Sequence, residues 1–193
     1  MMSYSADVVW AENSMHEEML ETKGTWETMH QNIINWVQQK VDTFELRNYK
    51  TLEIGSRYIN GTIRDCFTGP YVGIDFIDGL LVDIVMDAHT LEFPDASFDV
   101  VVCTEMLEHD SAFWVTLSEV GRVLRPGGHF LMTTRGNGFM EHSWPYDYWR
   151  FMKNSGELIA NLASCRLESC DDDPYAPGIF LHGIKNESDD NAA

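Results

Sequence analysis

Acidic residues lie at or just after the carboxyl ends of three predicted strands, at spacings that suit recognition of a ribose. Glu53 and Gly55 form an acidic-x-Gly turn, Asp75 follows the second strand, and Asp87 follows the third. Glycine lets a ligand approach the backbone closely, and a carboxylate about twenty residues later can accept hydrogen bonds from both hydroxyls of a ribose. A surface Asp that only caps a turn is the alternative for Asp75. The spacing favours a ligand-binding role for Asp75.

Short apolar runs alternate with helical segments from residue 50 onward, and this alternation predicts the sheet that carries these residues. Strands buried on both faces are typical of an α/β fold. We expect a Rossmann-like, doubly wound, mostly parallel sheet with helices on both faces. The seven expected strands are 51–54, 71–74, 82–85, 98–103, 129–134, 166–170 and 179–184.

Two helices are expected within this alternation. Asp110 can cap the first, which the Arg-Pro-Gly-Gly run at 125–128 would end before the fifth strand. The second spans 155–162, with its leucines and isoleucine turned inward. These three inward residues are Leu158, Ile159 and Leu162.

Residues 1–48 are predicted to be a helical segment ahead of the sheet. Apolar positions recur at spacings of three and four from Trp26 to Val41, which predicts one helix with Thr25 as its N-cap. A shorter helix is expected over 15–22, before Gly24. The length suits a single domain over 1–185, followed by a polar, disordered tail over 186–193.

The charge balance restricts the partners. With 13 Lys and Arg against 31 Asp and Glu, the net charge is −18, so the protein's field repels phosphate backbones and disfavours a large nucleic acid. The N-terminus lacks the pattern of a signal peptide, and no apolar run reaches the ~20 residues of a membrane span. We expect a cytoplasmic protein with a small or medium-sized partner molecule; the composition leaves the oligomeric state open.

The four cysteines show no metal-binding pattern. They form no C-x-x-C pair and no Cys/His cluster at zinc spacing, so no metal site is predicted. Cys165 and Cys170 would point to opposite faces of one strand, because their separation is odd. Reduced thiols are therefore expected.

The stretch from Leu91 to His109 adds a specific signature. It contains Pro94-Asp-Ala-Ser-Phe-Asp-Val, and Leu-Arg-Pro-Gly-Gly follows at 124–128. Together with the acidic-x-Gly turn, Asp75 and the Asp-Ala pair at 87–88, this order resembles the class I S-adenosylmethionine-dependent methyltransferases, in particular the small-molecule type 11. The resemblance covers about residues 51–134. It implies S-adenosylmethionine as cofactor and in-line transfer of its methyl group to a small or medium-sized acceptor.

The resemblance also implies roles for the glycine turn. Glu53, Gly55 and Ser56 should border the methionine part of the cofactor. The family usually has two further glycines at alternate positions, where this sequence has Arg57 and Ile59. Arg57 could pair with the cofactor's carboxylate, an interaction that a guanidinium makes well, or point to solvent.

Residues after the next strands are expected to bind the nucleoside. By the same resemblance, Asp75 holds the ribose and Phe76 packs on the adenine. Asp87 and Ala88 read the adenine edge, the carboxylate accepting from the exocyclic amine and the Ala88 amide donating to a ring nitrogen. Thr104 lies beside the sulfonium.

Methyl transfer from a sulfonium depends mainly on positioning the nucleophile, and a base would assist a hydroxyl or ammonium acceptor. The candidates are Glu105, Glu108 and His109 after the fourth strand, with His142 farther on. His109 would titrate near neutral pH if unperturbed. Glu108 and His109 could equally be structural residues that open the next helix.

An aromatic-rich loop over 135–151 follows the fifth strand, and its Pro-Tyr-Asp-Tyr-Trp-Arg-Phe run resembles one found in family members of this type. Glycines at 136 and 138 would let the loop close as a lid that presents Tyr146 to the acceptor. Alternatively, Tyr146, Trp149 and Phe151 pack the loop onto the sheet.

Two other functions compete with methyl transfer. The altered glycine turn gives some support to a non-catalytic protein that binds S-adenosylmethionine or S-adenosylhomocysteine as a sensor or partner subunit. A nicotinamide-dependent dehydrogenase would share the fold of the first half. That enzyme requires G-x-G-x-x-G after the first strand, and the run from Gly55 to Asn60 lacks it.

Overall fold

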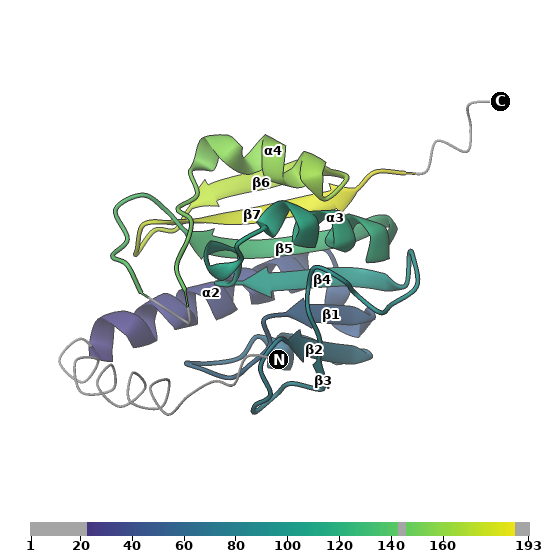
Figure 1. The fold of residues 1–193 in the computed structure, drawn as a ribbon, viewed down its shortest axis with the longest axis horizontal. Coiled ribbons are helices and arrows are strands. Elements are labelled where there is room, and N and C mark those ends of the chain that lie inside the picture. Colours follow the sequence, from purple (N-terminus) through teal and green to yellow (C-terminus); the bar gives the residue numbers. More distant parts are fainter. Residues whose placement is uncertain (1–22, 143–145, 188–193) are drawn as a thin grey trace.

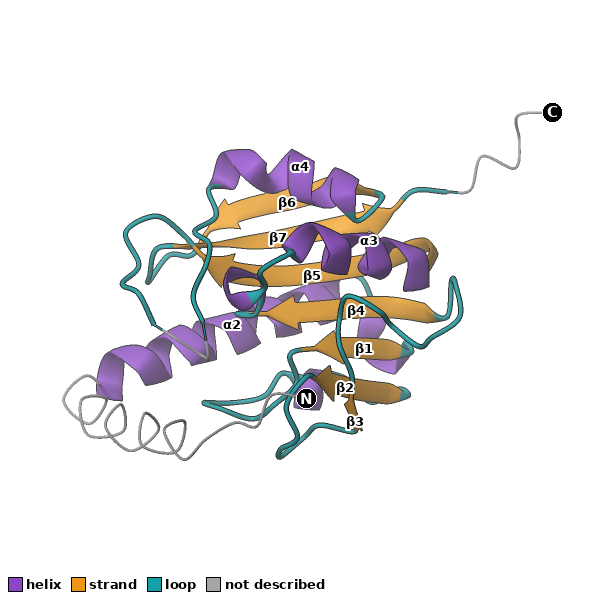
Figure 2. Ribbon diagram, in the orientation of Figure 1, coloured by secondary structure: helices purple, strands orange, loops and turns teal. Residues whose placement is uncertain are grey.

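The computed structural model describes residues 23–142 and 146–187, and its centre is a seven-stranded sheet (Figure 2). The strand order is β3-β2-β1-β4-β5-β7-β6. All neighbours from β3 to β5 pair in parallel, and β7 runs antiparallel to both β5 and β6. This confirms the predicted doubly wound, mostly parallel sheet. The strands are β1 (Thr51–Ile54), β2 (Tyr71–Asp75), β3 (Ile84–Val85), β4 (Phe98–Thr104), β5 (Leu124–Arg135), β6 (Cys165–Asp172) and β7 (Gly178–Lys185).

Helices cover both faces of the sheet, as predicted. In Figure 1, α3 (Phe113–Val123) and α4 (Gly156–Leu162) lie on the near face, and α2 (Lys23–Thr43) crosses the far face. Short 3-10 turns occupy Leu46–Asn48, Arg64–Cys66, Leu107–His109 and Lys153–Ser155. Among the described residues, no helix is both long and apolar enough to cross a membrane.

Strand β4 shows how the sheet separates two apolar layers. Its Val101 packs into the layer beneath α3 and α4, and the adjacent Val100 and Val102 pack into the layer beneath α2. All three are fully buried. Because side chains alternate along a strand, a continuous valine run serves both layers, and each fully buried side chain contributes roughly 1.5–3 kcal/mol to stability.

The boundaries of several elements differ from the prediction. Helix α2 begins at Lys23, so Gly24 and Thr25 lie inside its first turn, and Thr25 is not the N-cap. Strand β5 begins at Leu124 and includes the Arg-Pro-Gly-Gly run, which the sequence predicts as a turn between the helix and this strand. Strand β3 is only two residues long. The helix predicted over 15–22 and residues 188–193 of the predicted tail lie outside the described residues.

Two predicted side-chain orientations were wrong. Leu158 is 60% exposed, because α4 faces the sheet with Ile159 and Ala160 instead. Cys165 and Cys170 belong to the same apolar layer, since the pairing of β6 with β7 shifts register between Leu167 and Ser169 and restores a common face. All four cysteines are free thiols.

Candidate active site

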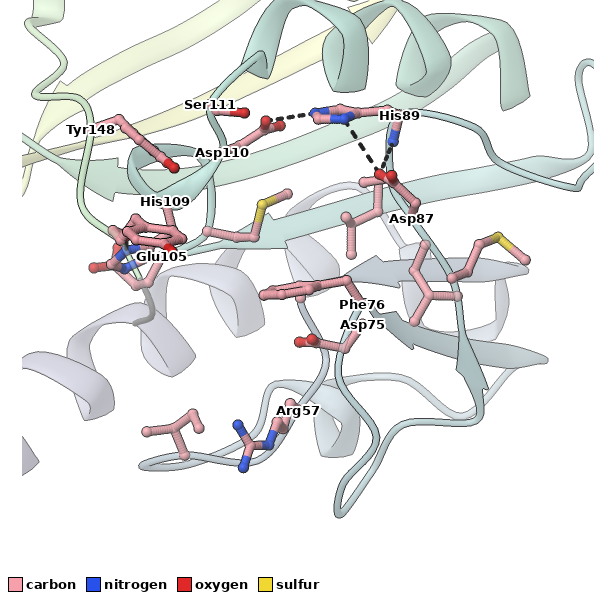
Figure 3. A pocket seen from close by; sticks show the side chains of 18 residues that line it. Arg57, Asp75, Phe76, Asp87, His89, Glu105, His109, Asp110, Ser111 and Tyr148 are labelled. Atoms are coloured by element: carbon pink, nitrogen blue, oxygen red, sulfur yellow. Dashed lines mark hydrogen bonds and ion pairs between the residues drawn. The ribbon is translucent and has the colours of Figure 1, made fainter. Parts of the chain in front are cut away.

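A cavity of about 310 Å³ opens at the carboxyl ends of the parallel strands (Figure 3). Ligands of open α/β sheets bind at this edge, where the strands lead into loops. Six of the nine predicted cofactor-binding residues line the cavity: Gly55, Arg57, Asp75, Phe76, Asp87 and Ala88. Glu53, Ser56 and Thr104 do not line it. We call this space the strand-end cavity.

The turn after β1 requires its glycine. Gly55 has φ +80°, and a Cβ there would lie 2.9 Å from Cγ of Met106. The backbone amides of Gly55 and Ser56 both donate to the carbonyl of Ile74, at 2.9 Å. The turn is thereby tied to β2, and the backbone remains open to the cavity at a position where any side chain would be strained.

Glu53 and Ser56 support this turn from behind. Glu53 is buried and its Oε2 accepts a hydrogen bond from the Tyr71 hydroxyl at 2.8 Å. Burial raises the pKa of Glu53 to about 7, and the Tyr71 hydrogen bond opposes that rise. The buried Ser56 hydroxyl donates to the carbonyl of Leu81 at 3.2 Å. Arg57 and Ile59, the two departures from the family pattern, both line the strand-end cavity.

Asp75 ends β2 with its carboxylate held by backbone. The amide of Ile77 donates to Oδ1 at 3.0 Å. Burial raises the pKa of Asp75, and hydrogen bonds from the Ile77 and Arg57 backbone oppose the rise. The neighbouring Phe76 ring is 52% exposed beside it (Figure 3). A fixed acceptor next to an exposed ring suits a sugar attached to a flat base.

A chain of polar contacts joins the end of β3 to the start of α3. His89 Nε2 lies 2.7 Å from Oδ1 of Asp110, and its Nδ1 lies 3.4 Å from Oδ1 of Asp87 (Figure 3). Asp110 also accepts from the amide of Ala112 at 2.8 Å, and the Thr116 hydroxyl donates to it at 2.6 Å. His89 and Asp110 line the cavity. Sequence reasoning had missed His89 and had assigned Asp110 only as a cap.

Glu105 lines the cavity from the end of β4 but is already engaged by neighbours. Its backbone is left-handed, with φ 52°. Thr133 Oγ1 donates to Glu105 Oε1 at 2.7 Å, and Glu105 Oε2 pairs with Arg135, which also pairs with Asp173 at 3.2 Å. Burial, together with the charge of Glu108, raises the pKa of Glu105 to about 7, and Arg135 opposes this.

The other base candidates form a buried group, in which only His109 lines the cavity. Glu108 is fully buried, and Thr134 Oγ1 donates to its Oε2 at 2.7 Å. His142 does not line the cavity; its ring lies edge-on to His109, with centroids 4.8 Å apart. Burial lowers the pKa of both histidines, that of His142 to about 4. Burial therefore favours the neutral imidazole in both residues.

Some residues of the aromatic loop pack against the protein, and others line the strand-end cavity. Trp149 Nε1 donates to the carbonyl of Asp110 at 2.8 Å, and the buried Phe151 ring packs edge-on against Phe113. Tyr146 and Tyr148 are exposed and line the cavity. Both interpretations of the loop therefore hold, for different residues. Its closure as a lid stays a prediction.

Known proteins share this fold and part of this sequence. Residues 60–132 match a family described as a methyltransferase domain. The structure of a 1,6-didemethyltoxoflavin-N1-methyltransferase from Burkholderia thailandensis, solved with S-adenosylhomocysteine and 1,6-didemethyltoxoflavin, superposes with a TM-score of 0.68 at 13% identity, covering 97% of this chain and 92% of that one. The chain therefore has the class I methyltransferase fold, as predicted, and its central segment is similar to the methyltransferase-domain family.

Two curated relatives are similar over shorter stretches. A fatty-acid O-methyltransferase of Mycolicibacterium smegmatis is 40% identical over 91 residues, which are 47% of this chain and 30% of the relative. A 27-O-demethylrifamycin SV methyltransferase of Amycolatopsis mediterranei is 43% identical over 56 residues, 29% of this chain and 21% of the relative. The chain thus spans less than a third of the length of these relatives.

Proposed function

We propose that this protein binds S-adenosylmethionine in the strand-end cavity and transfers its methyl group to a small or medium-sized acceptor. One observation carries the proposal: Gly55, Asp75 and the Asp87-Ala88 pair, far apart in sequence, line one cavity at the ends of three adjacent strands. They supply an open backbone, a ribose acceptor and an adenine-edge reader. Arg57 would face the cofactor's carboxylate.

Catalysis would depend mainly on how the protein positions the acceptor. Methyl transfer is an in-line displacement, so holding the acceptor about 3 Å from the methyl carbon supplies much of the acceleration. His109 is the base we propose for an acceptor that must lose a proton, because it lines the cavity and burial favours its neutral imidazole. Glu105 is the weaker candidate for this base, since Thr133 and Arg135 engage both of its oxygens.

The relatives favour an oxygen acceptor. One of them is named as an O-methyltransferase of fatty acids. In this chain the cavity wall near His109 includes apolar and aromatic side chains, Met106, Tyr146 and Tyr148 among them. Such a wall suits an acceptor that carries its oxygen on a largely apolar body.

Calorimetry tests the cofactor. S-adenosylhomocysteine should bind and NAD or NADP should not, because the dinucleotide fingerprint is missing after β1. The absence of heat and of a thermal shift with S-adenosylhomocysteine would contradict the proposal.

A non-catalytic binding protein is the second candidate, favoured by Arg57 and Ile59 in the cavity wall where the family has glycines. Incubation with methyl-labelled cofactor and cell extract separates the two. Transfer of label to any fraction excludes pure binding; binding without transfer in extracts of varied origin supports it.

A further inference from the structure

Three potential ligand atoms converge behind the wall of the strand-end cavity. Oε1 of Glu108 lies 4.0 Å from Nε2 of His109 and 4.0 Å from Nε2 of His142. All three atoms lie within 4.8 Å of one another. Glu108 and His109 belong to the turn after β4 and His142 to the aromatic loop, so the cluster joins two segments distant in the chain.

The Glu108 carboxylate is incompletely satisfied. Its side chain is fully buried and Oε2 accepts from Thr134, yet Oε1 has no hydrogen-bond partner in the part of the chain that the structure describes. An unpaired buried polar oxygen costs roughly 1–3 kcal/mol, and more when charged. Such an atom needs a donor or a cation, and it is aimed at the two imidazoles.

The outer contact of His109 turns its free lone pair inward. His109 Nδ1 lies 2.6 Å from the carbonyl oxygen of Tyr146, which can only accept, so this nitrogen carries the proton. His109 Nε2 then presents a lone pair to Glu108. His142 Nδ1 lies 3.2 Å from Oδ2 of Asp147 but makes no hydrogen bond within the described part of the chain. A cation bound between Glu108 Oε1 and the two Nε2 atoms would stabilise this arrangement.

The surroundings resemble the outer shell of a metal site. Asp147 accepts from both terminal nitrogens of Arg150 and from the backbone amide of His142, so the carboxylate beside this imidazole is itself fixed. Histidines that bind metals usually donate their other nitrogen to a carboxylate or carbonyl, as His109 does to the carbonyl of Tyr146. Around the cluster, the carboxyl groups outnumber the guanidinium groups of Arg135 and Arg150. The carboxyl groups are Glu105, Glu108, Asp147 and Asp173.

We propose that Glu108, His109 and His142 bind a divalent transition-metal ion. Two imidazoles and one carboxylate suit Zn²⁺, Co²⁺ or Mn²⁺ better than Mg²⁺ or Ca²⁺, which prefer oxygen ligands. Ligand bonds of about 2.0–2.1 Å place tetrahedral ligand atoms roughly 3.3 Å apart, so the cluster contracts on binding. No cysteine takes part, and His142 lies 34 residues after Glu108. Zinc-finger spacing rules therefore could not find the site.

The position of the site gives it a use. His109 lines the strand-end cavity and the other two ligands do not, so the ion would lie directly behind the wall of the space where the acceptor would lie. This use rests on the proposed function: in the metal-bound protein His109 would be a ligand and not the base, and the ion would bind the acceptor oxygen and hold it beside the sulfonium. Binding of the ion does not depend on that function.

Cobalt titration tests the site without cofactor or acceptor. Apo protein treated with a chelator should bind one Co²⁺ per chain with a visible d–d absorption band, and Zn²⁺ should displace it. Glu108→Gln and His142→Ala should each weaken binding by at least about 100-fold, above the 10–100-fold typical of losing an outer-shell partner. The control His129→Gln changes a half-buried histidine that pairs with His182 and should bind Co²⁺ like the parent.

Two outcomes would overturn the site: no stoichiometric Co²⁺ binding by the parent, or unchanged binding in both folded variants. Because Glu108 is buried, each variant is first compared with the parent by circular dichroism, and His142→Ala decides the matter if Glu108→Gln does not fold. Calorimetry with S-adenosylhomocysteine on the metal-free parent tests the proposed function separately.

Discussion

The two halves of the strand-end cavity are built by different means. Around β1 to β3, the two carboxylates proposed to bind the nucleoside are held by backbone amides two residues on, Asp75 by Ile77 and Asp87 by His89. Around β4 and β5, the polar groups are held by buried side chains distant in sequence, as Glu108 is by Thr134 and Arg135 by Asp173. The first half tolerates exposure, whereas the second places carboxyl groups in a low-dielectric interior, where the loss of a partner costs more.

This contrast suits the proposed division of labour. A cofactor with a charged end and a ribose can be bound by backbone and one carboxylate at an open edge. Orienting an acceptor, or a metal ion beside it, demands side chains fixed from several directions. Substitutions should therefore affect the first half mostly through ligand binding and the second mostly through stability.

The largest effect is expected at Arg135. Its side chain is nearly buried and pairs with Glu105 and Asp173, so Arg135→Met leaves the buried Asp173 and the partly buried Glu105 without their partner. Breaking a buried ion pair in this way costs about 3–5 kcal/mol, measurable by urea denaturation. The exposed pair of Arg166 and Glu168 offers the control: Arg166→Met should cost less than about 1 kcal/mol. Equal losses in the two variants would contradict the contrast.

Glu53 should make stability depend on pH. Its pKa is about 7 when folded against 4.5 for an unperturbed glutamate, so the folded state retains a proton that the unfolded state loses. Stability should fall as the pH rises from about 4.5 to 7 and then level off, by on the order of 2–3 kcal/mol. Glu53→Gln keeps the acceptor for Tyr71 and cannot ionise, so the part of this fall that Glu53 contributes should disappear, leaving that of Glu105, whose pKa is also about 7.

Denaturation curves measured between pH 4 and 8 check this, with the exposed Glu157→Gln as control. If Glu53→Gln retains the parent's slope, the pH dependence arises elsewhere.

Asp75 should affect ligand binding without a comparable loss of stability. Asp75→Ala should weaken S-adenosylhomocysteine binding by about 1.5–3 kcal/mol, the range for losing hydrogen bonds to a charged group. Asp75→Asn should lose less, because it keeps one acceptor. The neighbouring Asp78 is exposed and does not line the cavity, so Asp78→Ala should bind normally in the same calorimetry. Parent-like affinity of Asp75→Ala would remove it as the ribose ligand.

The same contrast explains what the sequence could predict. The seven strands, the parallel centre and the six predicted cofactor residues that line the cavity follow from local patterns and from the family resemblance, because each turn comes directly after its strand. Thr25, Leu158 and the Cys165–Cys170 pair were misplaced because caps, helix orientation and bulges depend on packing elsewhere. The partners of Glu105 and Glu108 come from β5, and no spacing rule connects them.

The smallest effect on cofactor binding is expected at Tyr146. Its side chain is 61% exposed and lines the cavity, while its backbone carbonyl, which any residue retains, orients His109. Tyr146→Phe therefore removes only a hydroxyl, and S-adenosylhomocysteine affinity should stay within a factor of about three, well under 1 kcal/mol. If the hydroxyl orients the acceptor, kcat/KM on an acceptor identified by label transfer should fall by much more than threefold.

Tyr175→Phe, equally exposed but outside the cavity, is the matched control and should leave both quantities unchanged. A Tyr146→Phe enzyme with full turnover would show that the loop contributes to the site only through its backbone and its packed aromatics. Acceptor selection would then have to come from Tyr148 and Met106 on the remaining wall. Loss of cofactor affinity in Tyr146→Phe would instead mean that the two halves of the cavity are not separable, since a side chain from the acceptor side would be binding the cofactor.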